Sequence, residues 1–196
     1  MPELKISRRA DAAFVEAFKS LVAKLARSAK TGSKDPIEMI LAGGAAMHFY
    51  TGSRISDDID AVYSKRLLVP ADSAVIYRDS EGNARSVHFD PNYNETFALM
   101  HEDAHQDALR LPVDVEGIRV MVLQPVDLAV SKLARFGEID REDILELVRA
   151  GLLTAQTLRK RAEEALPRYV GDLSTVKHSI DIACRDIEAL TRRAKR

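Results

Sequence analysis

The chain has 196 residues, of which 46% are hydrophobic and 30% are charged, enough for one large or two small globular domains. Its net charge of -1 gives no global positive field of the kind that drives non-specific binding to nucleic acids. The single cysteine, Cys184, excludes an internal disulfide framework and a Cys-rich zinc site. No N-terminal apolar stretch has the character of a signal peptide or a membrane span, so we expect a cytoplasmic protein without a membrane partner.

The first predicted element is an amphipathic helix over residues 11–29, which we expect to pack on a sheet. Glycine and proline in residues 31–36 end this helix and separate it from an apolar strand over residues 37–42. Five large apolar residues recur at helical spacing on one face of the predicted helix: Phe14, Phe18, Leu21, Val22 and Leu25.

A pair of adjacent glycines, Gly43 and Gly44, follows the predicted strand and precedes a helical segment over residues 45–50. Two glycines let the backbone bend sharply and approach a ligand with no Cβ in the way. The free N–H groups of the first turn of the following helix favour an anion at the same place.

Two carboxylates, Asp58 and Asp60, lie on a second predicted strand that runs to about Tyr63. Residues two apart on a strand project from the same face, so we expect these side chains to lie side by side. Two like charges held together repel unless a cation bridges them, and carboxylate oxygens suit Mg²⁺. The pattern predicts a site for Mg²⁺, or Mn²⁺ in its place, at Asp58 and Asp60.

The next segments predict further strands and one helix. Residues 75–77 and 86–89 form a hairpin signal around a turn over residues 79–83. A helical pattern extends from Thr96 to about Leu109, and residues 113–123 are typical of two strands joined at Gly117.

After Pro125 the pattern becomes helical throughout, over residues 126–136, 141–149, 154–166 and 173–193. We therefore predict an α+β fold in which a small mixed sheet flanked by helices is followed by a C-terminal helical bundle. The expected domains are residues 1–124 and residues 125–196, the second packed against the first.

The segment Ala42-Gly43-Gly44, thirteen intervening residues and Asp58-Ile59-Asp60 together resemble the signature of the DNA polymerase beta-like nucleotidyltransferase superfamily. Residues 127–136 and 140–144 look like the lysine helix and the acidic helix start of its minimal bacterial branch. That branch includes abortive-infection nucleotidyltransferase toxins and small proteins of toxin–antitoxin loci. The resemblance spans residues 38–147.

The resemblance implies an Mg²⁺-dependent nucleotidyltransferase that moves a nucleoside monophosphate from an NTP to an RNA end or a protein hydroxyl. Asp58 and Asp60 would hold the metal, and Gly43 and Gly44 would approach the β- and γ-phosphates. Many members carry serine at the second glycine position, where its hydroxyl contacts phosphate, and Gly44 has none. A cognate toxin or antitoxin is the protein partner that this branch implies.

The resemblance also implies a third carboxylate from a neighbouring strand. Asp90, at the end of the strand over residues 86–89, is the first candidate, although an aspartate before proline equally opens a turn. Asp114 and Glu116 are the rival pair, and an exposed hairpin face accounts for them as well. If none of the three lines the site, a catalytically weak or inactive protein that binds a nucleotide or a partner, in the manner of an antitoxin, is the alternative.

Three basic or polar residues are further candidates for nucleotide binding: Lys132 on the helix over residues 126–136, and Ser53 and Arg54 before the carboxylate strand. Lys132 can meet a triphosphate as a point charge, whereas a solvated basic face is the structural alternative and the favoured one for Arg135. Asp140 and Asp143 have the spacing of a helix N-cap and its N3 partner.

A separate motif, His101-Glu102-x-x-His105, matches the zinc metalloprotease pattern and leaves a zinc hydrolase as a remote alternative. Asp103, Gln106 and Asp107 make this segment polar, whereas the motif normally occupies a buried helix. A catalytic zinc also needs a third ligand, and nothing in the sequence distinguishes one.

Overall fold

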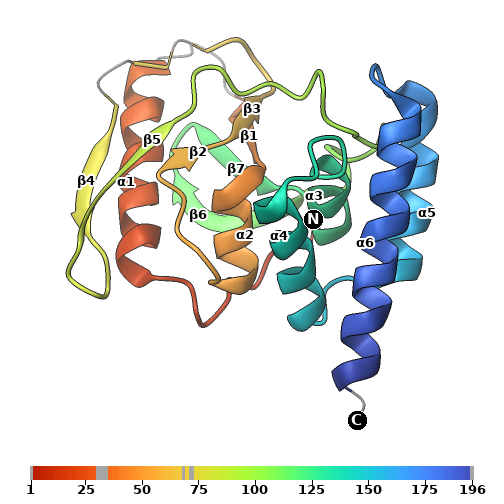
Figure 1. Ribbon diagram of the computed structural model, residues 1–196. Coiled ribbons are helices and arrows are strands. Elements are labelled where there is room, and N and C mark those ends of the chain that lie inside the picture. The colour runs from red at the N-terminus through yellow and green to blue at the C-terminus, as the bar shows by residue number, and fades with distance from the viewer. Residues whose placement is uncertain (1, 30–34, 68, 71–72, 195–196) are drawn as a thin grey trace. The chain divides into compact units, whose positions relative to one another are not determined.

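The computed structural model describes residues 2–29, 35–67, 69–70 and 73–194, so most of the predicted break over residues 31–36 lies outside the described residues. The chain divides into two compact units. We call Met1–Tyr93 with Ala108–Val122 the α/β unit, and Asn94–Asp107 with Leu123–Arg196 the helical unit. Figure 1 labels their elements, and each unit is described by itself.

A four-stranded sheet in the order β3-β1-β7-β6 forms the centre of the α/β unit. The apolar strand β1 (Ile37–Leu41) is parallel to β7 (Ile118–Val122) and antiparallel to β3 (Ala61–Tyr63). Strand β6 (Leu109–Val115) pairs with β7 as the hairpin predicted around Gly117, whose φ of 83° suits glycine. Both edges of β1 are hydrogen-bonded, one to β3 and one to β7, so the sheet fixes the position of the C-terminal end of β1, just before Gly43.

A three-stranded sheet in the order β2-β5-β4 completes the α/β unit. Strands β4 (Val75–Arg78) and β5 (Ala84–Phe89) are the predicted hairpin, and β2 (Asp58–Ile59) runs parallel to β5. The strand predicted from Asp58 to Tyr63 is therefore two strands, β2 in one sheet and β3 in the other. It divides at Asp60, whose carbonyl accepts a hydrogen bond of 2.9 Å from the backbone N–H of Ala42.

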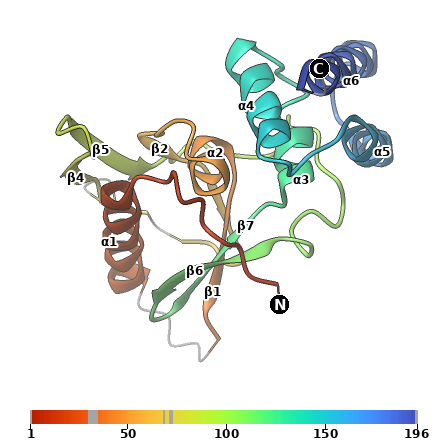
Figure 2. The same ribbon diagram turned by 90° about the horizontal axis from the view of Figure 1, so that it is seen from below.

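Two helices pack within the α/β unit. Helix α1 (Ala12–Ala29) confirms the amphipathic prediction, since its five predicted apolar residues are all buried. It lies beside β4 and β6, as both views show (Figures 1 and 2). Helix α2 (Gly43–Thr51) is buried along nearly its whole length, and Phe49 contacts both Phe14 and Phe18.

The helix predicted from Thr96 to Leu109 is wrong, because Asn94–Asp107 is a series of turns and β6 already begins at Leu109. Side chains compete here for the backbone donors that a helix needs. The N–H of Thr96 donates to Oδ1 of Asn94 at 3.2 Å, and the N–H of Asp103 donates to Nδ1 of His101 at 3.1 Å. The segment belongs to the helical unit.

The helical unit contains the four helices that the periodicity predicts. They are α3 (Pro125–Ser131), α4 (Glu138–Arg149), α5 (Ala155–Ala165, followed by a 3₁₀ turn over Leu166–Arg168) and α6 (Leu173–Ala194). Helix α3 ends before the predicted Phe136, because the chain tightens after Ser131 and Phe136 has a left-handed φ of 45°. Helices α5 and α6 lie side by side (Figure 1). The predicted α+β class is thus confirmed.

No helix in the described part of the chain is both long enough and apolar enough to cross a bilayer.

Candidate active site

The turn between β1 and α2 brings Gly43 and Asp60 together. A Cβ built on Gly43 would lie 1.7 Å from Oδ2 of Asp60, so the carboxylate occupies the space where any other side chain would begin. Gly43 also has a φ of 55°, a left-handed conformation that glycine adopts without strain. Glycine is therefore required at residue 43 for two reasons, its left-handed φ and the lack of space for a Cβ. The structure places the glycine turn and the Asp60 carboxylate together.

Gly44 faces two side chains of the loop that leads from α2 to β2. A Cβ on Gly44 would lie 2.7 Å from Nη1 of Arg54, 2.7 Å from Cβ of Ser56 and 2.8 Å from Oγ of Ser56. Arg54, predicted from the sequence, thus lies at the glycine turn. Ser56 was not predicted, and its only signal in the sequence is its place two residues before Asp58.

The parallel pairing of β2 and β5 places Asp90 next to Asp60. The register joins Asp58 with His88 and Ile59 with Phe89, and the N–H of Asp90 donates to the carbonyl of Ile59 at 3.1 Å. Oδ1 of Asp90 accepts a hydrogen bond of 2.8 Å from the N–H of Asn92. Asp90 therefore follows the end of β5 and opens a turn, and its role as the third carboxylate stays a prediction.

Asp58 projects from the exposed side of β2 and contacts a histidine that the sequence did not indicate. Its Oδ1 lies 2.9 Å from Nε2 of His88, and 63% of the Asp58 side chain is exposed. Ile59 is buried, as the alternation predicts, but β2 ends there and Asp60 lies between the two sheets. A ligand can reach Asp58 from solvent.

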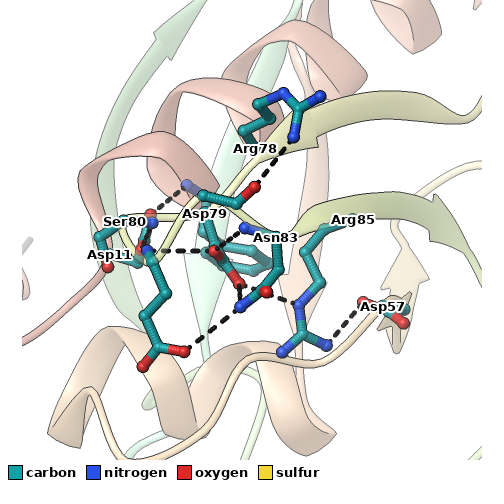
Figure 3. A network of polar contacts seen from close by, with 10 residues as sticks. Asp11, Asp57, Arg78, Asp79, Ser80, Asn83 and Arg85 are labelled. Atoms are coloured by element: carbon teal, nitrogen blue, oxygen red, sulfur yellow. Dashed lines mark hydrogen bonds and ion pairs between the residues drawn. The ribbon is translucent and has the colours of Figure 1, made fainter.

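An arginine links the β4–β5 hairpin to the residue before Asp58, as Figure 3 shows. Nε of Arg85 donates to Oδ2 of Asp79 at 3.2 Å, and Nη1 of Arg85 lies 3.9 Å from Oδ1 of Asp57. Burial raises the pKa of the Asp79 carboxyl, but hydrogen bonds from Asn83 and Arg85 outweigh it and leave that pKa lowered. Arg85 thereby lies between the carboxylates of Asp79 and Asp57 and offsets part of the charge beside Asp58.

Ser53 lies at the other end of α2 from the glycine turn. Its backbone N–H donates to Oγ1 of Thr51 at 3.2 Å, and the hydroxyl of Thr51 donates to Oγ of Ser53 at 2.8 Å. Nine helical residues span about 13 Å. The structure therefore does not bring Ser53 together with Gly43, and its nucleotide-binding role stays a prediction.

The rival carboxylates Asp114 and Glu116 belong to the β6–β7 hairpin. Asp114 pairs with Arg119 in the ladder, and Glu116 is exposed at the turn. The N–H of Ile37 donates to the carbonyl of Gly117 at 2.9 Å, so this turn adjoins the start of β1. The glycine turn follows the opposite end of β1, so the structure does not bring Asp114 or Glu116 to it, and the role of Asp90 stays a prediction.

Lys132 lies in a buried ion-pair cluster of the helical unit. Its Nζ is 2.8 Å from Oδ2 of Asp143 and 3.8 Å from Oδ1 of Asp140, and only 5% of the lysine side chain is exposed. Arg135 donates to both carboxylate oxygens of Asp140 at 2.8 and 2.7 Å. Burial raises the pKa of Asp140, but the hydrogen bond from Arg135 and the charge of Lys132 outweigh it and lower that pKa. The nucleotide-binding role of Lys132 stays a prediction.

The capping prediction at α4 is wrong in its positions, because the N-cap lies three residues before Asp140. Gly137 is the N-cap and Asp140 is the N3 residue, whose Oδ2 accepts the N–H of Gly137 at 3.1 Å. Asp143 lies inside the helix and pairs with Lys132 instead of completing a cap. The lysine and acidic motifs, separated in sequence, are thus one electrostatic cluster.

The His101-Glu102-x-x-His105 segment lies in turns, not on the helix that the zinc motif requires. Nε2 of His105 is 2.7 Å from Oε2 of Glu95, which raises the pKa of the histidine. Nε2 of His101 is 3.8 Å from Oε2 of Glu164. Among the described residues, no three His, Cys, Asp or Glu side chains form a group that could hold a metal by themselves. The arrangement gives the zinc-hydrolase alternative no support.

A divalent cation at the glycine turn would therefore rest on Asp58 and Asp60 as a pair. Both offer hard oxygen donors, and Mg²⁺ is commonly held by one or two carboxylates with substrate phosphates and water completing its shell. The residues present fit that mode of binding.

The mixed sheet, with a glycine turn at the end of β1 and helices around it, is consistent with a small nucleotidyltransferase fold. The chain belongs to the family described as "Nucleotidyltransferase of unknown function (DUF6036)", whose model matches residues 17–188. The match extends from α1 into α6 and so includes both units. No curated protein matches the chain. The family description carries no acceptor, metal or partner.

Proposed function

We propose that the protein transfers a nucleoside monophosphate from an NTP to a hydroxyl group of an RNA end or a protein, with Mg²⁺ or Mn²⁺ as cofactor. One observation carries this proposal: the carboxylate of Asp60 lies against Gly43, which joins the phosphate-approaching turn to the acidic strand. Family membership supports the reaction class and a nucleotide substrate.

Each residue of the site has a role in this proposal. Asp58 and Asp60 hold the cation, which when bound would offset the charge of the triphosphate. The N–H groups at the start of α2 face the β- and γ-phosphates, because they have no partner within the helix.

Asp90 is proposed as the base. The acceptor hydroxyl gives its proton to the Asp90 carboxylate while its oxygen bonds to the α-phosphorus and the bond to pyrophosphate breaks. The hydrogen bond from Asn92 fixes the orientation of the carboxylate for this step.

A second function, nucleotide or partner binding without transfer, is favoured by one specific observation. Asp58 is 2.9 Å from His88, so cation binding has to compete with an existing contact. A protein of this kind would act as a component of a toxin–antitoxin pair without turnover.

The experiment is label transfer from each of the four α-labelled NTPs to total RNA and to cell protein, with and without Mg²⁺. We expect transfer with Mg²⁺ that disappears in Asp58→Asn and Asp60→Asn. Glu116→Gln is the matched control, since it removes a carboxylate at the opposite end of β1. Filter retention of the label without transfer would support the second function, and neither retention nor transfer would contradict both.

A further inference from the structure

Ser56 and Arg54 occupy the space that a side chain at residue 44 would need. Gly44 has no left-handed φ, so its backbone would accept any residue. What requires glycine there is the approach of Nη1 of Arg54 and of Oγ of Ser56, at 2.7 and 2.8 Å from the position of a Cβ. The loop between α2 and β2 thus delivers a guanidinium and a hydroxyl to the glycine turn.

A buried histidine holds this loop in place. His48, on α2, is 2% exposed, and its Nε2 accepts the backbone N–H of Asp11 at 2.8 Å. Nδ1 therefore carries the ring proton and donates it to the carbonyl of Arg54 at 2.8 Å. Burial lowers the pKa of His48, although the Arg54 carbonyl and Asp11 act in the opposite direction. A neutral ring with this tautomer can make both hydrogen bonds, which fixes the backbone of Arg54.

Asp11 connects this histidine to the start of α1 and to the hairpin. Its Oδ1 accepts the N–H of Phe14, as a helix N-cap does, and its Oδ2 accepts the N–H of Ser80 at 2.7 Å (Figure 3). The ring of Phe14 packs edge-on against His48 at 4.8 Å. The anchor of Arg54 is therefore part of the rigid core of the α/β unit, which suits a binding element that must be preorganised.

We infer that the hydroxyl of Ser56 and the guanidinium of Arg54 are a phosphate-binding pair, positioned by His48, that contacts the β- and γ-phosphates of the NTP. This inference rests on the proposed function. It adds to that function the two residues whose side chains occupy the space beside Gly44. A guanidinium gives charge-assisted hydrogen bonds to phosphate oxygens, and a serine hydroxyl adds a neutral donor. Oxygens of the terminal phosphates carry the charge that such a pair recognises, so the pair discriminates triphosphates from monophosphates.

The test measures dissociation constants of the four NTPs with Mg²⁺ and of the matching NMPs by calorimetry. We expect Arg54→Met to weaken triphosphate binding about 10- to 100-fold and Ser56→Ala about 3- to 10-fold. Monophosphate binding should change less than about 2-fold, because these variants keep the rest of the site. Arg78→Met and Ser28→Ala, on β4 and at the end of α1, are the matched controls.

A swap of the hydroxyl tests the position directly. Ser56→Gly removes the two close atoms of Ser56 and leaves Nη1 of Arg54, the end of a long side chain that can shift, so Gly44→Ser in that background can supply a hydroxyl near the same place. We expect the double variant to restore triphosphate binding to within about 3-fold of wild type, whereas Gly44→Ser alone weakens it, because its Cβ meets Ser56. Thermal melts of each variant identify any that fail to fold.

His48→Asn tests the positioning role, since an amide can accept from Asp11 and donate to Arg54. We expect His48→Ala to raise KM for the NTP more than it lowers kcat, and His48→Asn to recover part of the loss. Wild-type triphosphate affinity in Arg54→Met and Ser56→Ala, with transfer intact, would overturn the inference and leave the proposed function standing. Absence of NTP binding in the wild type would overturn both.

Discussion

The aspartates of the candidate site and the buried aspartates of the helical unit lie in opposite environments. In the α/β unit, Asp58 is largely exposed at the edge of β2 and Asp60 lies against a glycine. In the helical unit, Asp140, Asp143 and Asp127 are buried, and cations of the same unit neutralise them. Arg161 makes a fork to Asp127 at 2.7 Å and reaches Asp107 at 2.6 Å.

This contrast separates two uses of the same residue type. A buried carboxylate that already has a cation partner stabilises its own unit and has little capacity for a ligand. An exposed carboxylate such as that of Asp58 contributes little to stability and keeps its oxygens accessible to a cation. Substitutions of these two groups of aspartates, or of the cations that pair with them, should therefore affect different measurements, transfer for the first group and stability for the second.

The largest expected effect is the loss of transfer in Asp60→Asn. An amide keeps the shape of the side chain beside Gly43 but removes the charge, so we expect label transfer to fall by at least about 100-fold. The melting temperature should stay within about 2 °C of wild type, since the amide keeps the size and shape of the side chain. A variant that unfolds instead would place Asp60 with the structural aspartates and break the comparison.

Lys132→Met should give the largest loss of stability. It leaves Asp143 and Asp140 buried with one cation fewer, which costs about 3–5 kcal/mol of the free energy of unfolding in a urea titration. Lys19→Met, at an exposed pair with Glu16, is the control and should change stability by less than about 0.5 kcal/mol. Full stability combined with a raised KM for the NTP would instead establish Lys132 as a nucleotide-binding residue.

Asp11→Ala should lower the free energy of unfolding by about 1–2 kcal/mol, the usual effect of removing a helix N-cap. Hydrogen bonds from Ser80 and Phe14 outweigh the burial that raises the pKa of Asp11 and bring it to about 2, so this contribution should persist down to low pH. Chemical denaturation at pH 7 and pH 4 measures it. An equal stability of variant and wild type would remove Asp11 as the anchor of α1.

The smallest expected effects are the pH dependences of stability that two histidines contribute, His48 in the α/β unit and His105 in the helical unit. The pKa of His48 lies below its ordinary value of 6.5, so the unfolded chain binds the proton first and stability falls as the pH drops below about 6.5. The pKa of His105 is raised, so its contribution is complete below about 6.5 and is lost as the pH rises through its pKa. Unfolding of His48→Gln and His105→Gln between pH 5 and 8 should show opposite slopes relative to wild type. If the stability difference from wild type changed with pH in the same direction for both variants, the opposite pKa shifts of His48 and His105 would be contradicted.

Much of the fold could be predicted because its patterns are local. The amphipathic face of α1, the hairpin around residues 79–83 and the helices after Pro125 all follow from periodicity and turn residues. The error at residues 96–109 has a physical cause, since Asn94 and His101 bind the backbone donors that the helix would use. Apolar spacing alone does not reveal that competition.

The candidate site could be predicted only where one sequence segment carries it. Gly43, Asp58 and Asp60 are indicated by their spacing, and Arg54 by its nearness to them. Ser56 and His88 join the site through the fold, one by the path of a loop and the other by the parallel register of β2 and β5. Lys132 is buried because α4 packs beside α3 and brings Asp143 to it. No pattern within a single helix predicts that contact.

The predicted strand divides at Asp60, so this residue lies where the two sheets of the α/β unit meet. The carbonyl of Ile59 accepts a hydrogen bond from Asp90, on the side of β5, while the carbonyl of Asp60 accepts one from Ala42, on the side of β1. The carbonyls of two consecutive residues thus hydrogen-bond toward different sheets at the candidate site. A displacement of one sheet against the other would strain the backbone on either side of Asp60. Under the proposed function, substitutions deep in either sheet would then change the transfer rate without touching a substrate.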